Sequence, residues 1–307
     1  MQNRLVVNIL LGLSFSVLVS ACSSFNKLQK SGTDAEKYKA ATEYYQKKDW
    51  YHAGLLFEEL IPVLKGSTES EMAQFYYAYT QYNQQQYLLS ATLFKKFYET
   101  FARSDYAQEA MYLYAKSLYK DTPQYNLDQS NTLTATSALQ DFLNAYPDSQ
   151  YKPEATEYIM DLRKKLERKA YEKAKLYFKT SGFNIASYKS AVIAINNFQK
   201  EFPDSEYNEE LAFLKVDAEF SLAQNSLETK QKERYQEAMG YHQEFIDKYP
   251  QSSYVKQTEK MYETSQKEIE RLNKLEQERE QEKQREQEKR KSTDPSRPAK
   301  VTTASND

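Results

Sequence analysis

A spaced pattern of residues recurs five times along the chain and limits the folds that the chain can adopt. Each copy has an aromatic or similar residue, a small residue three positions later, mostly apolar residues at positions seven, ten and fourteen, and a serine at seventeen. Steps of three and four place these residues on one face of a helix. The copies begin at Trp50, Tyr87, Thr132, Tyr188 and Tyr235 and end at Ser67, Ser104, Ser149, Ser205 and Ser252.

Proline ends three of these helices, because Pro147, Pro203 and Pro250 directly follow the last aromatic residue of a copy. The segments between the copies also have helical patterns, so each repeat is predicted to be a pair of antiparallel helices. One pair cannot bury its own apolar face, and the pairs are therefore expected to stack. The sequence predicts an all-α fold, a tetratricopeptide-like right-handed helical solenoid of about five helix pairs over residues 34–265.

The composition agrees with this fold and excludes one class of partner. With 6 glycines and 8 prolines, tight hairpin turns are scarce, and 27 tyrosines and 15 phenylalanines supply side chains for the seams between helices. The 42 basic and 44 acidic side chains nearly cancel. No large net field would attract nucleic acid, so no nucleic-acid partner is expected.

The amino terminus has the layout of a secretory signal. Residues 5–19 form an apolar run of about 15 residues, shorter than the roughly 20 that a spanning helix needs. Small residues precede Cys22, the only cysteine, in an arrangement that resembles the lipobox of bacterial lipoproteins. We expect residues 1–21 to be a lipoprotein signal peptide, Cys22 to be lipidated and held in a membrane, and residues 22–33 to form a flexible tether.

The residues that follow Cys22 bear on which membrane holds the lipid. Residues 23 and 24 are both serine, so the aspartate that usually retains such lipoproteins in the inner membrane is missing. We therefore expect anchoring in the outer membrane, on its periplasmic face.

The carboxy-terminal segment 266–307 changes in composition to Glu, Gln, Lys and Arg, with almost nothing apolar after Leu275. Such a segment cannot pack as a core. We expect a solvated helix to about residue 290, stabilised by opposite charges four residues apart, and a disordered tail beyond it. A coiled coil that binds a partner is the alternative, although the segment has no apolar heptad pattern.

Residue types that carry catalysis are scarce. His52 and His242 are the only histidines, they have no zinc-type spacing, and His242 takes an apolar position of the pattern. No metal site, cofactor or enzymatic activity is expected. The working surface is instead predicted to be a concave groove where tyrosines of the first helix in each pair contact an extended or helical peptide. The candidates are Tyr45, Tyr79, Tyr82 and Tyr112, and the alternative is that they only pack against neighbouring helices.

The lipobox and the repeats together resemble the BamD family, the tetratricopeptide lipoproteins of the outer-membrane β-barrel assembly (BAM) machine. The resemblance extends over nearly all of residues 22–265 and is carried by segments 146–151, 154–156, 162–166 and 174–178, by Tyr207, and by loop 125–130, which resembles the family's insertion. It implies binding of the periplasmic domains of a BamA-like β-barrel protein through the carboxy-terminal repeats. It also implies that unfolded outer-membrane proteins are received near the amino-terminal repeats.

The chain departs from this family in two ways, in the fourth repeat and in a charged extension after residue 265 that is longer than the family requires. Many relatives carry Asn-Arg in the second helix of the fourth repeat, where this chain has Ile193 and Ala194. The alternative function is that of a periplasmic tetratricopeptide adaptor lipoprotein in cell-wall or envelope organisation, which would share the anchor and the solenoid. The two hypotheses differ in the partner that each predicts.

Overall fold

The structure, a computed structural model, describes residues 24–182 and 184–292, with side chains described to residue 290. The predicted signal peptide and Cys22 lie outside these residues. Regular secondary structure in the described ranges is helical throughout, which confirms the all-α, tetratricopeptide-like repeat fold. The helices are α2 (Asp34–Gln46), α3 (Trp50–Leu60), α4 (Ser70–Asn83), α5 (Tyr87–Thr100), α6 (Ala107–Lys120), α7 (Ser130–Ala145), α8 (Lys152–Thr180), α9 (Ala186–Glu201), α10 (Asn208–Gln224), α11 (Glu228–Lys248) and α12 (Val255–Ser292).

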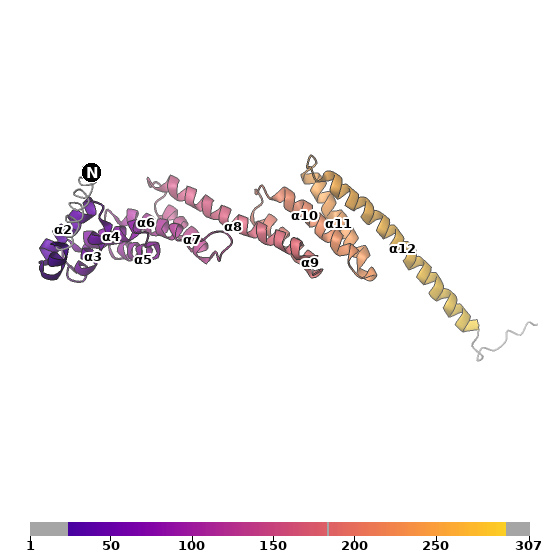
Figure 1. Cartoon of the computed structure of the whole chain (residues 1–307). Helices are drawn as coiled ribbons and strands as arrows, with labels where there is room; N and C mark the ends of the chain where they lie inside the picture. The colour runs from indigo at the N-terminus through magenta and orange to yellow at the C-terminus, as the bar shows by residue number, and fades with distance from the viewer. Residues whose placement is uncertain (1–23, 183, 293–307) are drawn as a thin grey trace, which may run out of the picture. The chain divides into compact units, whose positions relative to one another are not determined.

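The helices belong to two compact units, Met1–Leu166 and Glu167–Asp307. In the first unit, α2 pairs with α3, α4 with α5 and α6 with α7, and the first part of α8 packs on the same core (Figure 1). In the second unit, α9 packs on α10, α10 on α11, and α11 on α12. Each unit therefore consists of helices that pack mainly on their neighbours in the sequence, as a repeat protein does.

The predicted helical face forms the core of both units. Its apolar positions are at most 1% exposed at Phe57, Leu60, Phe94, Phe97, Leu139, Phe142, Ile195, Phe198 and Phe245. Helices α5, α7, α9 and α11 each end directly before the last aromatic residue of the pattern, whose backbone N–H donates to a carbonyl in the preceding turn. The pattern thus located the buried face and the ends of these four helices.

The amino-terminal segment differs from the predicted flexible tether over residues 22–33. Residues 24–31 are helical, and Phe25 is only 5% exposed because its ring packs against Tyr44 and His52. Thr33 then caps α2, where its side chain and that of Glu36 form a reciprocal capping box. An aromatic ring close to the first helix pair therefore orders part of the segment that is predicted to be a flexible tether.

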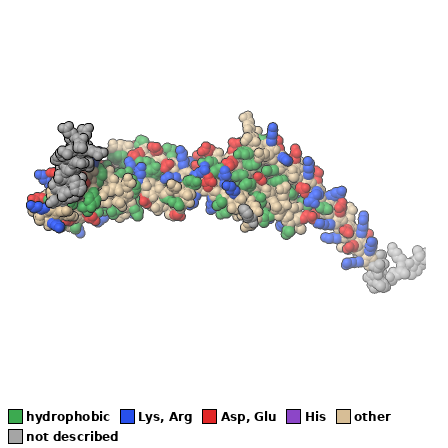
Figure 2. Space-filling model, viewed as in Figure 1, with side chains coloured by type: hydrophobic (Ala, Val, Ile, Leu, Met, Phe, Trp, Pro, Cys, Tyr) green, Lys and Arg blue, Asp and Glu red, His purple; other side chains and the backbone are tan. Residues whose placement is uncertain are grey.

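The packed part of the carboxy-terminal unit continues past the predicted boundary at residue 265. Leu272 of α12 is 3% exposed and packs with Ala223 and Tyr235. Farther along, Lys232 and Glu276 form an ion pair of 3.0 Å between α11 and α12. Beyond that point α12 is exposed, and Figure 2 shows acidic and basic side chains interspersed along it. Among the described helices, none is both long and apolar enough to cross a bilayer.

Candidate functional site

Four turns between repeats have the same construction. In each of them a serine hydroxyl accepts the backbone N–H of the tyrosine two residues later, over 3.0–3.2 Å. The pairs are Ser104 and Tyr106, Ser149 and Tyr151, Ser205 and Tyr207, and Ser252 and Tyr254. The residue three positions after each tyrosine lies on the same face of the following helix. That residue is Glu109, Glu154, Glu210 and Gln257 in turn.

In the amino-terminal unit, one of these turns completes a cluster of two tyrosines, a glutamate and a lysine. The ring of Tyr151 stacks on that of Tyr112 of α6, with centroids 4.2 Å apart and planes 6° from parallel. The Tyr112 hydroxyl donates to the carboxylate of Glu154, and Lys116 forms an ion pair with the same carboxylate at 2.9 Å. We call Tyr112, Lys116, Tyr151 and Glu154 the unit-1 cluster.

The unit-1 cluster keeps its glutamate ionised. Desolvation by burial acts to raise the pKa of Glu154, but hydrogen bonds from Tyr112, Tyr158 and Lys116 outweigh it and lower the pKa to about 2. The Lys116 ammonium also lies 5.3 Å from the centroid of the Tyr112 ring, within range of a cation–π contact. The cluster thus links α6 to α8 through charge-assisted hydrogen bonds.

The carboxy-terminal unit contains a cluster of the same construction. Tyr207 stacks on Tyr171 with ring centroids 4.1 Å apart, and the Tyr171 hydroxyl donates to Glu210 over 2.5 Å. Lys175 contacts both the Glu210 carboxylate and the Tyr171 hydroxyl at 2.8 Å. Desolvation acts against ionisation of Glu210, yet these partners lower its pKa below the ordinary value. We call Tyr171, Lys175, Tyr207 and Glu210 the unit-2 cluster.

The turn at Ser104 has the glutamate but not its partners. Here Tyr106 packs on Phe75, at 5.0 Å and 40°, so the ring that takes the place of Tyr112 carries no hydroxyl. Four residues after Phe75, where the clusters have lysine, the chain has Tyr79. Glu109 is partly buried, and desolvation by burial raises its pKa, the opposite direction to Glu154. We call Phe75, Tyr79, Tyr106 and Glu109 the open position.

Three of the four tyrosines predicted to line a groove lie together near the open position. Tyr45 of α2 contacts Tyr79 of α4 at 5.9 Å between ring centroids, and Tyr79 contacts Tyr82 at 6.4 Å. Tyr76 joins them, 4.1 Å from Tyr45. These four side chains are all partly exposed, and we call them the aromatic face.

Tyr112 does not belong to this face. It is 2% exposed, its ring lies between Tyr151 and Phe142, and its hydroxyl donates a hydrogen bond to Glu154. The ring of Tyr112 thus packs between helices, as the alternative for these tyrosines states, and its contact with a peptide stays a prediction.

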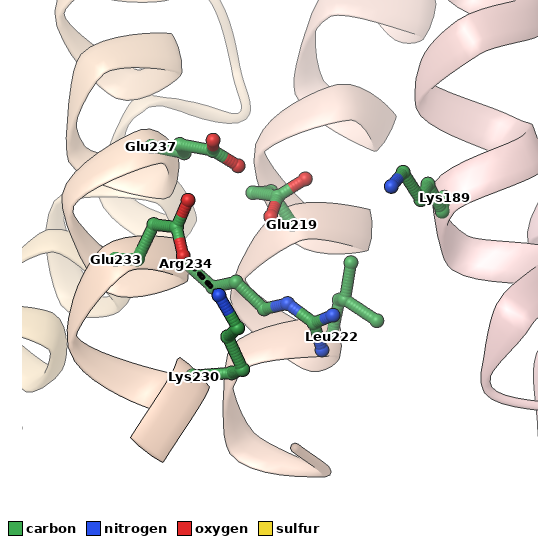
Figure 3. Close-up of a pocket in the computed structure, with 7 residues that line it drawn as sticks. All are labelled: Lys189, Glu219, Leu222, Lys230, Glu233, Arg234 and Glu237. Atoms are coloured by element: carbon green, nitrogen blue, oxygen red, sulfur yellow. Dashed lines mark hydrogen bonds and ion pairs between the residues drawn. The ribbon is translucent and has the colours of Figure 1, made fainter. Parts of the chain in front are cut away.

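A small polar pocket in the carboxy-terminal unit is the second feature of interest. Its volume is about 260 Å³, and the side chains around it are Lys189, Glu219, Leu222, Lys230, Glu233, Arg234 and Glu237 (Figure 3). Lys230 is paired with Glu233, and Arg234 donates to the Ser226 hydroxyl. Glu219 is 4% exposed and its Oε1 atom has no hydrogen-bond partner. Burial, together with the nearby Glu237, raises the pKa of Glu219.

The histidines and carboxylates do not form a metal centre in the part of the chain that the structure describes, where no group of three or more potential ligands converges. His52 lies against Asp49, with 2.8 Å between Nδ1 and the carboxylate. His242 is buried, 4.8 Å from the Tyr262 ring, and its Nδ1 has no partner. His242 therefore occupies its position in the repeat as a packing residue.

Comparison with known proteins places the chain in a family. The family model of the YfiO outer membrane lipoproteins matches residues 30–186 and 181–273. The matched residues make up well over half of the chain, which therefore belongs to this family, the BamD family. Membership makes it an outer-membrane lipoprotein of helical scaffold type.

Two other comparisons add no functional information. No curated protein matches the chain. A solved structure described as "Computational Design of Self-Assembling Cyclic Protein Homooligomers" matches 89% of this chain and 99% of its own, at 13% identity. Its TM-score is 0.19, which supports no inference about fold or function.

The tyrosine–glutamate–lysine clusters are the features that the sequence pattern missed. The repeat pattern ends at its serine, whereas the recurring tyrosine and glutamate stand two and five residues farther on. Extending the pattern by five residues would have shown that Glu109, Glu154 and Glu210 are equivalent. Their different partners, however, depend on which residues of the preceding helix face them.

Proposed function

We propose that this lipoprotein is the BamD-type scaffold subunit of the outer-membrane β-barrel assembly machine. The observation that supports the proposal most strongly is the family match over residues 30–186 and 181–273, which includes both clusters and the aromatic face. In this role the protein works by shape and peptide recognition, anchored by lipid on Cys22 on the periplasmic face, with no turnover of its own.

The carboxy-terminal unit would bind the periplasmic domains of a BamA-like β-barrel protein. Ile193, which stands where many relatives carry a polar residue, is 53% exposed on α9. The chain can therefore offer a partner an apolar contact at Ile193, whereas Ala194, which stands where those relatives carry arginine, cannot form an ion pair. We therefore include Ile193 in the proposed interface.

The amino-terminal unit would receive unfolded outer-membrane proteins at the aromatic face. Tyr45, Tyr76, Tyr79 and Tyr82 are partly exposed and in contact with one another. Tyrosine offers a large contact area and a hydroxyl at a low cost in side-chain entropy, which suits recognition of segments that differ in sequence.

The proposal is tested by recovering the protein from gently solubilised outer membranes through a tag placed after residue 300, and identifying what remains bound by mass spectrometry. We expect a BamA-like barrel in near equal amounts. Truncation after residue 275 should preserve this association, whereas Ile193→Asp should reduce it and Leu227→Asp, at a residue 81% exposed, should not. Recovery of cell-wall enzymes in place of a barrel would refute the proposal and support the envelope-adaptor alternative.

A further inference from the structure

We infer that Glu109 and the tyrosines around it form a subsite for a lysine or arginine side chain of a bound, extended partner chain. The inference rests on the proposed function of the amino-terminal unit and specifies what that unit recognises. It follows from three observations: the composition of the two complete clusters, the lack of an internal partner for Glu109, and the aromatic surroundings of its carboxylate.

The complete clusters show what a glutamate at this point of the repeat binds. In the unit-1 cluster the ammonium of Lys116 contacts Glu154 and lies over the Tyr112 ring. In the unit-2 cluster Lys175 contacts Glu210 and lies 4.8 Å from the centroid of the Tyr171 ring. The same arrangement of a carboxylate, an ammonium and an aromatic ring thus occurs twice in the chain.

At the open position this arrangement lacks its cation. Phe75 and Tyr79 stand where the unit-1 cluster has Tyr112 and Lys116, so α4 has neither the hydroxyl of Tyr112 nor the ammonium of Lys116 at the equivalent places. No hydrogen bond or ion pair connects Glu109 to another side chain within the described residues, and burial alone accounts for its raised pKa. A partly buried carboxylate without a partner is a costly arrangement, and a cation from another chain would relieve that cost.

The surroundings of Glu109 suit an ammonium or guanidinium group. After desolvation, the charge of Glu109 is the next largest cause that raises the pKa of both Tyr79 and Tyr151, and it also raises that of Tyr45. The charge of the carboxylate therefore acts on three tyrosines, and ring contacts connect Tyr106 of its own turn to Tyr79 through Phe75. A guest cation would meet a negative charge together with aromatic rings, as Lys116 does beside Glu154.

The guest is a side chain of a polypeptide. Among the described residues, Glu109 is not part of a group of carboxylates and histidines that could hold a metal ion. Its neighbours Tyr45 and Tyr79 belong to the aromatic face, which runs across α2 and α4 and can contact the residues that flank the basic side chain. An extended segment with one lysine or arginine between aromatic residues fits both features.

The test uses two fluorescent peptides and the purified full chain in detergent micelles. The peptides are identical 12-residue sequences with aromatic residues on both sides of a central position, which is lysine in one and norleucine in the other. Fluorescence anisotropy should show that the lysine peptide binds the wild-type chain about fivefold more tightly, a difference of ~1 kcal/mol. Equal binding of the two peptides would overturn the inference.

Substitutions at the open position separate the subsite from general electrostatics. Glu109→Gln should abolish the preference for lysine and leave norleucine-peptide binding unchanged. The matched control Glu99→Gln removes the same charge from an exposed position on α5 and should preserve the preference. Phe75→Tyr, which offers Glu109 an internal hydroxyl, should reduce the preference, whereas Phe213→Tyr in the other unit should not. A preference that survives Glu109→Gln would also refute the subsite.

The same measurements distinguish failure of the inference from failure of the proposed function. If both peptides bind equally well, the amino-terminal unit receives extended chains but has no subsite for a cation. If neither peptide binds and denatured outer-membrane protein does not bind either, the proposed role of the unit in receiving substrate fails with it.

Discussion

Glu154 and Glu109 occupy the same place in consecutive repeats, yet their surroundings give them opposite properties. Both stand three residues after a tyrosine whose N–H is held by a serine. Two tyrosine hydroxyls and Lys116 donate hydrogen bonds to Glu154 and lower its pKa to about 2. Glu109 has no such donors, and desolvation by burial raises its pKa. A repeat fold can therefore place the same carboxylate once as a bond between helices and once as a group left for a partner.

The carboxy-terminal unit shows the same contrast with a different outcome. The unit-2 cluster around Glu210 is complete, but at the next repeat Phe213 stacks on Tyr254, at 4.4 Å and 10°, with Gln257 in the place of glutamate. That position keeps the aromatic stack but has no glutamate at the turn. The open position is the one among these four turns that has a glutamate without its partners, which is why we assign recognition to it.

The largest change in the free energy of unfolding is expected from a substitution in the core next to the unit-1 cluster. Phe142 is fully buried against Tyr112, so Phe142→Ala should lower the free energy of unfolding of the amino-terminal unit by about 3–5 kcal/mol. Leu133→Ala, at a residue 58% exposed on the same helix, should change it by no more than about 0.5 kcal/mol. Urea unfolding, followed by circular dichroism, measures both changes in the free energy of unfolding. Equal changes would mean that the predicted helical face does not form the core.

A second prediction separates the two glutamates directly. Glu154→Gln removes the charge that accepts from Tyr112, Tyr158 and Lys116, and should lower the free energy of unfolding by about 1–2 kcal/mol, a value reduced because the Glu154 side chain is 42% exposed. Glu109→Gln removes a carboxylate without partners and should leave stability unchanged or slightly higher. Chemical denaturation at pH 7 compares the two variants. A similar loss in both would contradict the distinction between the two positions.

A third prediction concerns pH, and the two glutamates should act in opposite directions. The pKa of Glu154 is about 2 in the folded state against an ordinary 4.5, so its contribution to stability is present above about pH 4.5 and is lost as pH falls toward 2. The pKa of Glu109 is raised, so its cost is absent below pH 4.5 and develops as pH rises through its folded-state pKa. The free energy of unfolding is measured against pH for the wild type, Glu154→Gln and Glu109→Gln. The difference between the wild type and Glu154→Gln should increase with pH, whereas the difference between the wild type and Glu109→Gln should decrease with pH.

The smallest expected effect comes from completing the open position. Phe75→Tyr places a hydroxyl where Tyr112 has one, and a hydrogen bond to Glu109 should raise the free energy of unfolding by up to about 1 kcal/mol. Phe213→Tyr is the matched control, because its turn has Gln257 and offers no charged acceptor. If both substitutions had the same effect in thermal unfolding, the benefit would not come from Glu109.

The repeat pattern predicted the fold well because helix periodicity specifies which residues share a buried face. It located Phe57, Phe97 and Phe142 in the core, and its last aromatic residue marked the end of α5, α7, α9 and α11. It did not predict the order at residues 24–31 or the packing of Leu272, because each depends on one apolar side chain meeting a distant helix.

The candidate site was harder to predict for a related reason. Tyr79 and Tyr112 look alike in sequence, and both lie on the first helix of a pair, but only Tyr112 is closed off by the next repeat. Whether each glutamate has a partner likewise depends on the residue that the preceding helix presents, which is Lys116 in one repeat and Tyr79 in another. Periodicity within one helix gives no information about that register.

The central claim, that one glutamate joins helices and its equivalent awaits a basic side chain, is tested most directly by measuring both pKa values with and without a ligand. NMR of the full chain with labelled glutamate side chains, titrated alone and with the lysine peptide, gives these values. We predict that the pKa of Glu109 lies above that of Glu154 and falls when the peptide binds, whereas the pKa of Glu154 stays the same. Equal values in the free protein, or a Glu109 pKa that the peptide leaves unchanged, would contradict the account.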